Sequence, residues 1–288
     1  MPGGGARSHT YTAIVPRFFV PASAVVGGRG TIEGADAAHL ARSLRARPGE
    51  LVVVADDGGR EHGLRLEEVR PERVTGSVAW TAPATGEPRL RVHVLQALAA
   101  PGMDEAVAAL AQVGAASIRP VLTRRTTARL DAPRRTARQE RWHAIAREGA
   151  ALAGRGWPPE VHPPLALPAA VAALGADLPL LVCVPDAPTA LPHWPMARGT
   201  AEVAVLIGPE GGLDAAELES LLPRGTPVHL GARVLPARLA GMVAVSLLLA
   251  VAGDLDAGVA TREASAEAGR RAREGEGGRP PGRRRGPD

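Results

Sequence analysis

Residues 203–213 read VAVLIGPEGGL, and residues 214–221 continue as DAAELESL. The apolar run predicts a buried strand, and Asp214 can cap a following helix in a capping box with Glu217. Glycines 208, 211 and 212 allow the backbone to approach a ligand closely. Open α/β sheets bind their ligands at the carboxyl ends of strands. The stretch therefore predicts a binding loop, although a tight strand-to-helix turn would also require glycine.

A second, similar element follows within a few residues. Residues 228–235 read VHLGARVL, and a helix of small and apolar residues then runs to AVAGDL at 250–255. Upstream, from residue 89, short apolar runs alternate with helical patterns, including helices expected over 137–152 and 214–222. This alternation predicts a parallel sheet with helices on both faces.

The earlier part of the chain has a different pattern. Residues 16–82 contain several short strand patterns bounded by glycine-rich and proline-rich turns, with one short helix expected at 37–44. Residues 81–88 are rich in Pro, Ala, Thr and Gly and are expected to link this β-rich domain to a second domain at 88–255. Residues 1–15 and the Arg/Gly/Pro-rich tail at 256–288 are expected to be disordered.

Composition restricts the function classes. The single cysteine, Cys183, excludes an internal disulfide and a multi-cysteine metal site, and the histidines have no ligand spacing, so no metal is expected. No apolar run approaches the roughly 18 residues of a membrane span, so we expect a cytoplasmic protein. Residues 123–147 hold eight arginines and two acidic residues, which predicts either contact with an RNA backbone or a solvated helix face.

Several stretches, in order along the chain, carry a resemblance to a known family: RFFV (17–20), HLARSLRARPGE (39–50), GREHG (59–63), LRVHVLQAL (90–98), AREGAALAGR (146–155), IGPEGG (207–212) and LGARVL (230–235). Together they resemble the knotted (SPOUT) methyltransferases that modify N3 of a uridine in 16S ribosomal RNA. The resemblance covers residues 17–255.

The resemblance implies an α/β fold with two domains. A PUA-like β-barrel that docks RNA would occupy residues 16–82, and a trefoil-knotted SPOUT methyltransferase domain would occupy 88–255 and form a homodimer. The substrate would be 16S ribosomal RNA or the 30S subunit, and the cofactor would be S-adenosyl-L-methionine. The residues carried over as cofactor-binding are Ile207, Gly208, Pro209, Glu210, Gly211, Gly212, Leu230, Gly231, Leu235 and Ala240.

Methyl transfer from a sulfonium requires little of the protein beyond orienting the uracil and stabilising its anion as the N3 proton leaves. Three arginines are candidates for this catalytic role, with an ion pair as the alternative for each: Arg233, Arg238 and Arg155. Five further arginines are candidates for RNA binding: Arg17, Arg42, Arg45, Arg124 and Arg125.

The match fails at several positions. Where the family usually has Leu-Arg-x-x-Thr-Ala, residues 235–240 read LPARLA, so Pro236 and Leu239 replace an arginine and a threonine. Ala99–Ala100 replaces Lys-Gly, and Leu152 replaces a glutamine. These losses of polar groups leave two alternatives open: a methyltransferase acting on a small nucleoside or heterocycle, and a catalytically inactive relative that binds RNA or the cofactor.

Overall fold

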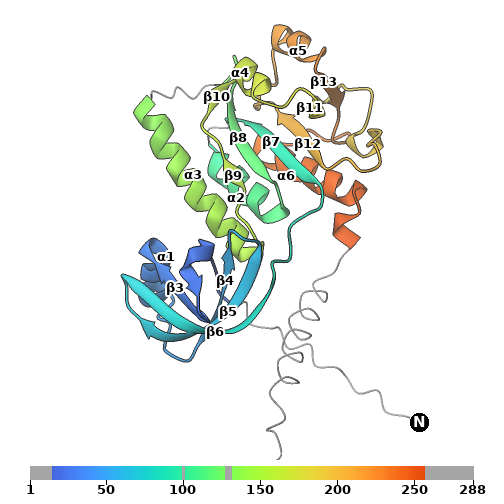
Figure 1. The fold of residues 1–288 in the computed structure, drawn as a ribbon. Coiled ribbons are helices and arrows are strands. Elements are labelled where there is room, and N and C mark those ends of the chain that lie inside the picture. The colour runs from blue at the N-terminus through green and yellow to red at the C-terminus, as the bar shows by residue number, and fades with distance from the viewer. Residues whose placement is uncertain (1–14, 99–100, 127–131, 257–288) are drawn as a thin grey trace, which may run out of the picture.

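The structure, a computed structural model, describes residues 15–98, 101–126 and 132–256 and contains two units, each built around its own sheet (Figure 1). Nearly all of both predicted disordered ends, and the altered pair Ala99–Ala100, lie outside the described residues.

The N-terminal unit is a strongly curved sheet of six strands in the order β1-β4-β5-β6-β3-β2. All its pairs are antiparallel except β1 with β4. The two edge strands are consecutive in the chain and are joined by the short helix η1 (Ala22–Ala24). The strands are β1 (Arg17–Val20), β2 (Val25–Val26), β3 (Arg29–Glu33), β4 (Leu51–Asp56), β5 (Arg60–Val69) and β6 (Arg73–Pro83).

One short helix closes this curved sheet. The helix predicted at 37–44 begins three residues earlier, as α1 (Gly34–Ala38), and continues as the π-helical turn η2 (His39–Ser43). Leu40 is fully buried against alternate residues of the sheet, such as Val52 and Leu64. The predicted linker is shorter than expected, because β6 includes residues 81–83 and pairs them with β5.

A buried polar network fixes the turn between β4 and β5. Asp56 Oδ1 accepts the backbone N–H groups of Gly58 (3.0 Å) and Arg60 (2.9 Å), and Asp56 Oδ2 lies 2.9 Å from His62 Nε2. The other ring nitrogen of His62 lies 2.9 Å from Thr81 Oγ1 on β6. Burial alone would raise the pKa of Asp56, but the hydrogen bonds from His62 and the two amides outweigh it and lower that pKa.

The C-terminal unit contains a parallel sheet in the order β10-β8-β7-β12-β11-β13, with β9 beside β8. Every described pair in it is parallel, which confirms the predicted sheet type. The strands are β7 (Arg91–Ala97), β8 (Ser117–Leu122), β9 (Glu160–Val161), β10 (Leu165–Ala166), β11 (Leu180–Cys183), β12 (Glu202–Ile207) and β13 (Gly225–Val228).

Helices cover both faces of this sheet because its strands are apolar on both sides. On one face Val94 belongs to the same apolar cluster as Leu110 and Leu248, whereas its neighbour Leu95 packs on the other face with Leu221. The first face carries α2 (Met103–Val113), α3 (Ala132–Leu152) and α6 (Ala237–Val251), and the second carries α4 (Leu167–Ala172) and α5 (Ala215–Leu221).

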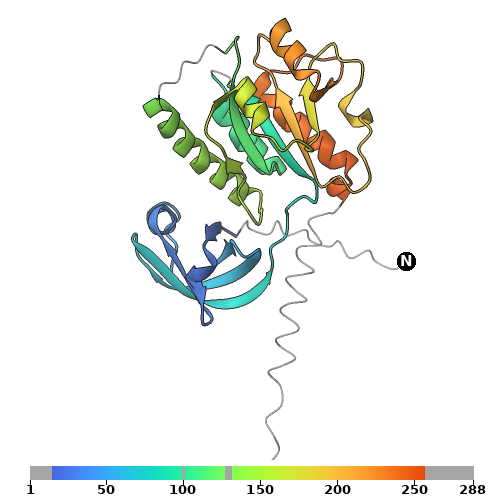
Figure 2. The same ribbon diagram turned by 45° about the horizontal axis from the view of Figure 1, so that its top comes forward.

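Helix α3 joins the two units, and its carboxyl end lies against the N-terminal sheet in both views (Figures 1 and 2). Arg147 donates to the Phe19 carbonyl and pairs with Asp36 at 2.6 Å. Just beyond the helix, Arg155 is 3% exposed and its Nη2 lies 2.6 Å from Glu87 Oε2 in the linker. The first ion pair ties α3 to α1 of the N-terminal unit, and the second ties the segment after α3 to the linker.

We expect Asp56→Asn to lower the free energy of unfolding by about 1–3 kcal/mol at neutral pH, because the substitution leaves buried hydrogen-bond donors without a charged acceptor. Since folding lowers the pKa of Asp56, its contribution is present at neutral pH and is lost as the pH falls below about 4. Urea unfolding at several pH values tests this. The difference between wild type and variant should shrink in acid, and a difference independent of pH would contradict the assignment. Glu72→Gln, at an exposed acidic side chain, is the control.

Candidate functional site

A cavity of about 480 Å³ lies at the carboxyl edge of the parallel sheet. The loops that follow three neighbouring strands form its walls: 183–188 after β11, 207–213 after β12, and 230–235 after β13. Ala237 and Ala240, at the start of α6, complete it. The two glycine-containing loops predicted to bind a ligand therefore face the same space.

Strand register explains why these loops meet. Cys183, the last residue of β11, is aligned with Ile207 of β12 on one side and with Val228 of β13 on the other. The segment after β13 then pairs with the segment after β11: the His229 N–H donates to the Thr189 carbonyl at 2.9 Å, and the His229 carbonyl accepts from Leu191 N–H at 2.9 Å. Backbone hydrogen bonds thus fix the loops after β11 and β13 against each other, and the pairing of β11 with β12 places the third loop beside them.

Two glycines take conformations that other residues rarely adopt. Gly212 has φ +72° and closes a turn in which its N–H donates to the Pro209 carbonyl at 2.8 Å. Gly231 has φ +103°, and its N–H donates to His229 Nδ1 at 3.1 Å. Both positions require glycine for backbone reasons, and the lack of a Cβ also leaves main-chain groups accessible from the cavity.

The capping box predicted at the start of α5 is present. Asp214 Oδ1 accepts the Glu217 N–H at 2.7 Å, and Glu217 Oε2 accepts the Asp214 N–H at 3.1 Å. The hydrogen bond from the Glu217 amide, together with the charge of Arg124, lowers the pKa of Asp214. The glycine loop is therefore anchored at its far end by a helix cap.

The loop after β8 packs onto this anchor and brings two of the predicted RNA-binding residues to the site. The Arg124 N–H donates to Glu217 Oε1 at 2.7 Å, and its guanidinium pairs with Asp214 at 3.3 Å. Arg125 Nη1 donates to the Gly211 carbonyl at 2.5 Å. Both side chains are otherwise exposed, so they lie beside the glycine loop with room to contact a bound molecule.

Of the residues predicted to bind the cofactor, all except Gly211 line the cavity. Gly211 instead presents its carbonyl to Arg125. Sequence reasoning missed the third wall, residues 183–188, which read CVPDAP. The position of this turn directly after the buried run LPLLVCV was the available signal, because carboxyl ends of parallel strands share one edge.

The three candidate catalytic arginines lie in different places. Arg233 lines the cavity. Arg238 is on the first turn of α6, where its Nε lies 3.2 Å from Glu105 Oε2 of α2. Arg155 is at the junction of the units, where Nη1 donates to the carbonyls of Ala111 and Ala115, each at 2.9 Å. This geometry favours a structural role for Arg155 and an ion pair for Arg238. Of the three arginines, Arg233 is the one that a molecule in the cavity could contact.

The other predicted RNA-binding residues lie on the N-terminal unit. Arg42 and Arg45 are exposed. Arg17 is largely buried at the junction, where it pairs with Glu61 at 2.7 Å and donates to the Arg155 carbonyl at 3.2 Å. Contact with RNA stays a prediction for Arg42 and Arg45. The side chain of Arg17 is already engaged by Glu61 and by the Arg155 carbonyl.

The floor of the cavity is apolar and chemically inert. Burial raises the pKa of the Cys183 thiol to about 12, so it stays protonated and cannot act as a nucleophile at neutral pH. Below the start of α6, the fully buried Gln96 donates from Nε2 to the Ala237 carbonyl at 3.2 Å. Main-chain groups of the loops therefore make up much of the cavity's polar surface, and Arg233, Glu210 and Asp186 bring charge to its walls.

Two features are absent from the residues that the structure describes. Among them, no three His, Cys, Asp or Glu side chains are grouped so that they could hold a metal ion. No described helix combines the length and the hydropathy needed to cross a membrane.

Comparison with known proteins gives consistent matches. The family model described as an RNA methyltransferase domain matches residues 86–249. The chain is 28% identical to ribosomal RNA small subunit methyltransferase E of Synechocystis over 252 residues, 85% of this chain and 80% of the relative. It is 28% identical to the protein of that name from Mycobacterium tuberculosis, over 79% of this chain and 88% of the relative.

A solved structure agrees with these matches. A methyltransferase from Legionella pneumophila, described as a complex with its bound cofactor SAM, superposes with a TM-score of 0.74 at 25% identity. The superposition covers 82% of this chain and 97% of the other.

We expect Glu217→Ala to lower the free energy of unfolding by about 1–3 kcal/mol, because the buried carboxylate accepts backbone N–H groups from two loops. The loops at 123–126 and 208–214 should also exchange their amide hydrogens faster. Glu219→Ala, at an exposed position on the same helix, should change stability by less than about 0.5 kcal/mol. Equal effects of the two substitutions would show that the Glu217 contacts do not stabilise the site.

Proposed function

We propose that this chain, which belongs to the RNA methyltransferase domain family, uses S-adenosyl-L-methionine to methylate N3 of a uridine in 16S ribosomal RNA. Its fold, an N-terminal antiparallel β unit followed by a parallel-sheet SPOUT methyltransferase domain, is the one expected from the sequence. One observation carries the proposal: the two glycine loops that follow β12 and β13 face each other across one cavity.

The residues around the cavity fit the proposed cofactor. Its volume of about 480 Å³ lies within the range of small-molecule sites. Because Gly208, Gly212 and Gly231 have no Cβ atoms, an adenosine could approach the main chain of both loops closely, and Ile207 and Leu235 offer apolar contact. When bound, S-adenosylmethionine supplies a methyl group already activated on its sulfonium.

The remaining chemical task falls to this chain's own side chains. Arg233 is exposed at the cavity wall and forms no ion pair with any described residue. A guanidinium there can stabilise the uracil anion that forms as the N3 proton leaves. Arg125 lies beside the same glycine loop and, with Arg124, offers donors to the RNA backbone around the target base. Arg42 and Arg45 extend these contacts onto the N-terminal, PUA-like unit.

The departures from the family pattern fall where their structural cost is small. Pro236 directly precedes α6, and its carbonyl accepts the Ala240 N–H at 3.0 Å, so the helix start does not need a proline N–H. Leu239 is 39% exposed and Leu152 is 59% exposed. These residues leave the glycine loops intact, which favours retained cofactor binding over the alternative of an inactive chain that has lost the cofactor.

We further propose that the chain forms a homodimer through α6. The helix is apolar over most of its circumference, with Arg238 and Ser246 as its polar side chains, and only one of its faces packs on the sheet. The other face presents Leu239, Met242, Val243 and Leu247, none of which is fully buried by the rest of the described chain. A second copy would cover this face next to the cavity. The substrate, 16S ribosomal RNA or the 30S subunit, places the reaction in the cytoplasm.

Gly231→Ala should weaken S-adenosylmethionine binding by about tenfold or more, because a side chain at φ +103° forces the loop to move. Gly199→Ala is the matched control, since Gly199 has φ +83° and does not line the cavity. Isothermal titration with S-adenosylmethionine measures both variants. If Gly231→Ala and wild type bound S-adenosylmethionine with equal affinity, the second glycine loop would not be part of the cofactor site.

Arg233→Ala should lower the rate of methyl transfer by about 100-fold while leaving cofactor affinity nearly unchanged, as expected for a group that stabilises a transition-state charge. Arg238→Ala, which breaks only the pair with Glu105, is the control and should retain most activity. The assay incubates unmodified 30S subunits with labelled cofactor and identifies 3-methyluridine by mass spectrometry.

The outcomes of this assay separate the alternatives. Methyl transfer to uridine or free uracil, with none to 30S subunits, would show that the substrate is a small heterocycle and not ribosomal RNA. Tight cofactor binding without transfer to either substrate would support the inactive relative and contradict the proposed activity.

A further inference from the structure

The linker between the two units, residues 84–90, is fixed at both of its ends. At its start the Ala84 N–H donates to the Gly59 carbonyl of the N-terminal unit at 2.9 Å. At its end the N–H groups of Arg89 and Leu90 donate to the Asp254 carboxylate, just after α6, at 2.9 and 3.1 Å. Linkers rich in Pro, Gly and polar residues usually let domains move. This linker is instead held to both units.

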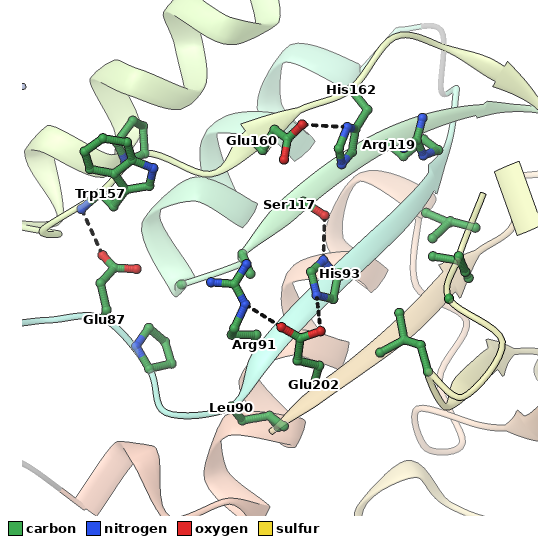
Figure 3. Close-up of a pocket in the computed structure, with 18 of the residues that line it drawn as sticks. Glu87, Leu90, Arg91, His93, Ser117, Arg119, Trp157, Glu160, His162 and Glu202 are labelled. Atoms are coloured by element: carbon green, nitrogen blue, oxygen red, sulfur yellow. Dashed lines mark hydrogen bonds and ion pairs between the residues drawn. The ribbon is translucent and has the colours of Figure 1, made fainter. Parts of the chain in front are cut away.

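One ion pair holds the middle of the linker. Glu87 accepts hydrogen bonds from Nε and Nη2 of Arg155 at 3.1 and 2.6 Å, a bidentate geometry that orients both side chains. The same carboxylate accepts the backbone N–H of Trp157 at 3.2 Å (Figure 3). The buried guanidinium of Arg155 also caps the carboxyl end of α2, where Nη1 donates to the carbonyls of Ala111 and Ala115. Arg155 therefore ties the linker to the C-terminal unit.

The backbone next to Arg155 touches the linker directly. A Cβ added at Gly156 would lie 2.8 Å from the Ala84 Cβ, well inside the roughly 3.5 Å of an ordinary carbon–carbon contact. Gly156 does not have a positive φ, so its backbone conformation would accept another residue. Glycine at this position is therefore required by the close approach of the linker and not by a turn.

A second arginine extends these contacts into the N-terminal unit. Arg17 donates from Nη1 to the Arg155 carbonyl at 3.2 Å and from Nη2 to Glu61 at 2.7 Å. The apolar contact between the units is small, and its buried members are Phe19, Ala55 and Ala150. Domains joined by a small apolar interface normally move relative to each other. The angle between the units therefore depends on the charged contacts at the linker and on the ion pair between α3 and α1.

This angle decides where the proposed RNA contacts lie relative to the cofactor cavity. Arg42 and Arg45 belong to the N-terminal unit, which the linker joins to the amino end of β7, whereas the cavity lies at the carboxyl ends of the strands (Figure 1). The seven residues of β7 alone separate these two ends by about 20 Å. Two contact areas held in a fixed geometry can bind one RNA together, and this gain is lost when the geometry no longer fits.

We propose that Arg155 is a positioning residue for the reaction. Glu87, Arg155 and Gly156 form a junction clamp that fixes the linker, so that the RNA contacts of the N-terminal unit and the cofactor cavity engage one RNA at the same time. The inference rests on the proposed function, because the clamp acts on the binding of the ribosomal substrate. No member of the junction clamp lines the cofactor cavity.

Two variants loosen the junction clamp in different ways. Glu87→Gln removes the charge that pairs with Arg155, whereas Gly156→Ala pushes the linker away and changes no charge. The matched controls are Glu72→Gln, at an exposed side chain, and Gly175→Ala, where a Cβ meets nothing within 4 Å. Circular dichroism checks the folding of each variant. If Glu87→Gln does not fold, Gly156→Ala carries the test alone.

Double electron–electron resonance measures the distance between the units. Spin labels on Ser43→Cys and Glu219→Cys, both at exposed positions, report from η2 and α5 in a Cys183→Ala background. An excess of unlabelled protein restricts the signal to distances within one chain. The intact junction clamp should give one narrow distance distribution. Both clamp variants should broaden this distribution, and both controls should leave it unchanged.

Ligand binding provides the second readout. The dissociation constant for unmodified 30S subunits should rise about tenfold in both clamp variants. The affinity for S-adenosylmethionine should stay as in wild type, because the cavity is built on other residues. A general loss of structure would weaken the binding of both ligands. The difference between the two ligands therefore separates a positioning role from an effect on stability.

The proposal is overturned if correctly folded clamp variants keep the narrow distance distribution, or if they bind 30S subunits as tightly as wild type does. Wild type distinguishes this failure from failure of the proposed function. If wild type and the clamp variants bind and methylate 30S subunits equally well, only the role of the junction clamp is contradicted. If wild type binds no 30S subunits, the proposed substrate is contradicted, and the role of the junction clamp with it.

Discussion

The backbone pairing at the ends of three neighbouring parallel strands is the constraint on which the site depends. Because β11 lies between β12 and β13 in matched register, Cys183, Ile207 and Val228 end at one level of the sheet. The pairing continues past the strands, where His229 exchanges backbone hydrogen bonds with Thr189 and Leu191. The walls of the cavity are therefore fixed by main-chain geometry, which changes little when side chains are substituted.

Because the cavity depends on backbone geometry, substitutions of nearby side chains leave its walls in place. The glycines at 212 and 231 hold conformations that few substitutions would allow. Pro236 and Leu239, in contrast, occupy a helix start and an exposed position, where replacement is tolerated. Neither residue lines the cavity, whose walls keep the glycines that the sequence predicted.

The sequence predicted best those features that are set locally. The Asp214 capping box, the sheet type and the meeting of the two glycine loops follow from short motifs and from the rule for strand ends, and the structure contains all three. Partners distant in sequence could not be predicted. The pairing of Arg155 with Glu87 depends on how the two units pack. The sequence around Arg155 therefore gave no sign that this arginine is buried.

A crystal structure of the protein with S-adenosylmethionine would show whether loop backbones hold the cofactor. We expect the adenosine between residues 208–212 and 230–240, with main-chain groups of both loops in hydrogen-bond contact with it. A cofactor bound elsewhere, or held mainly by side chains while these loops stay apart from it, would rule out backbone recognition in this cavity.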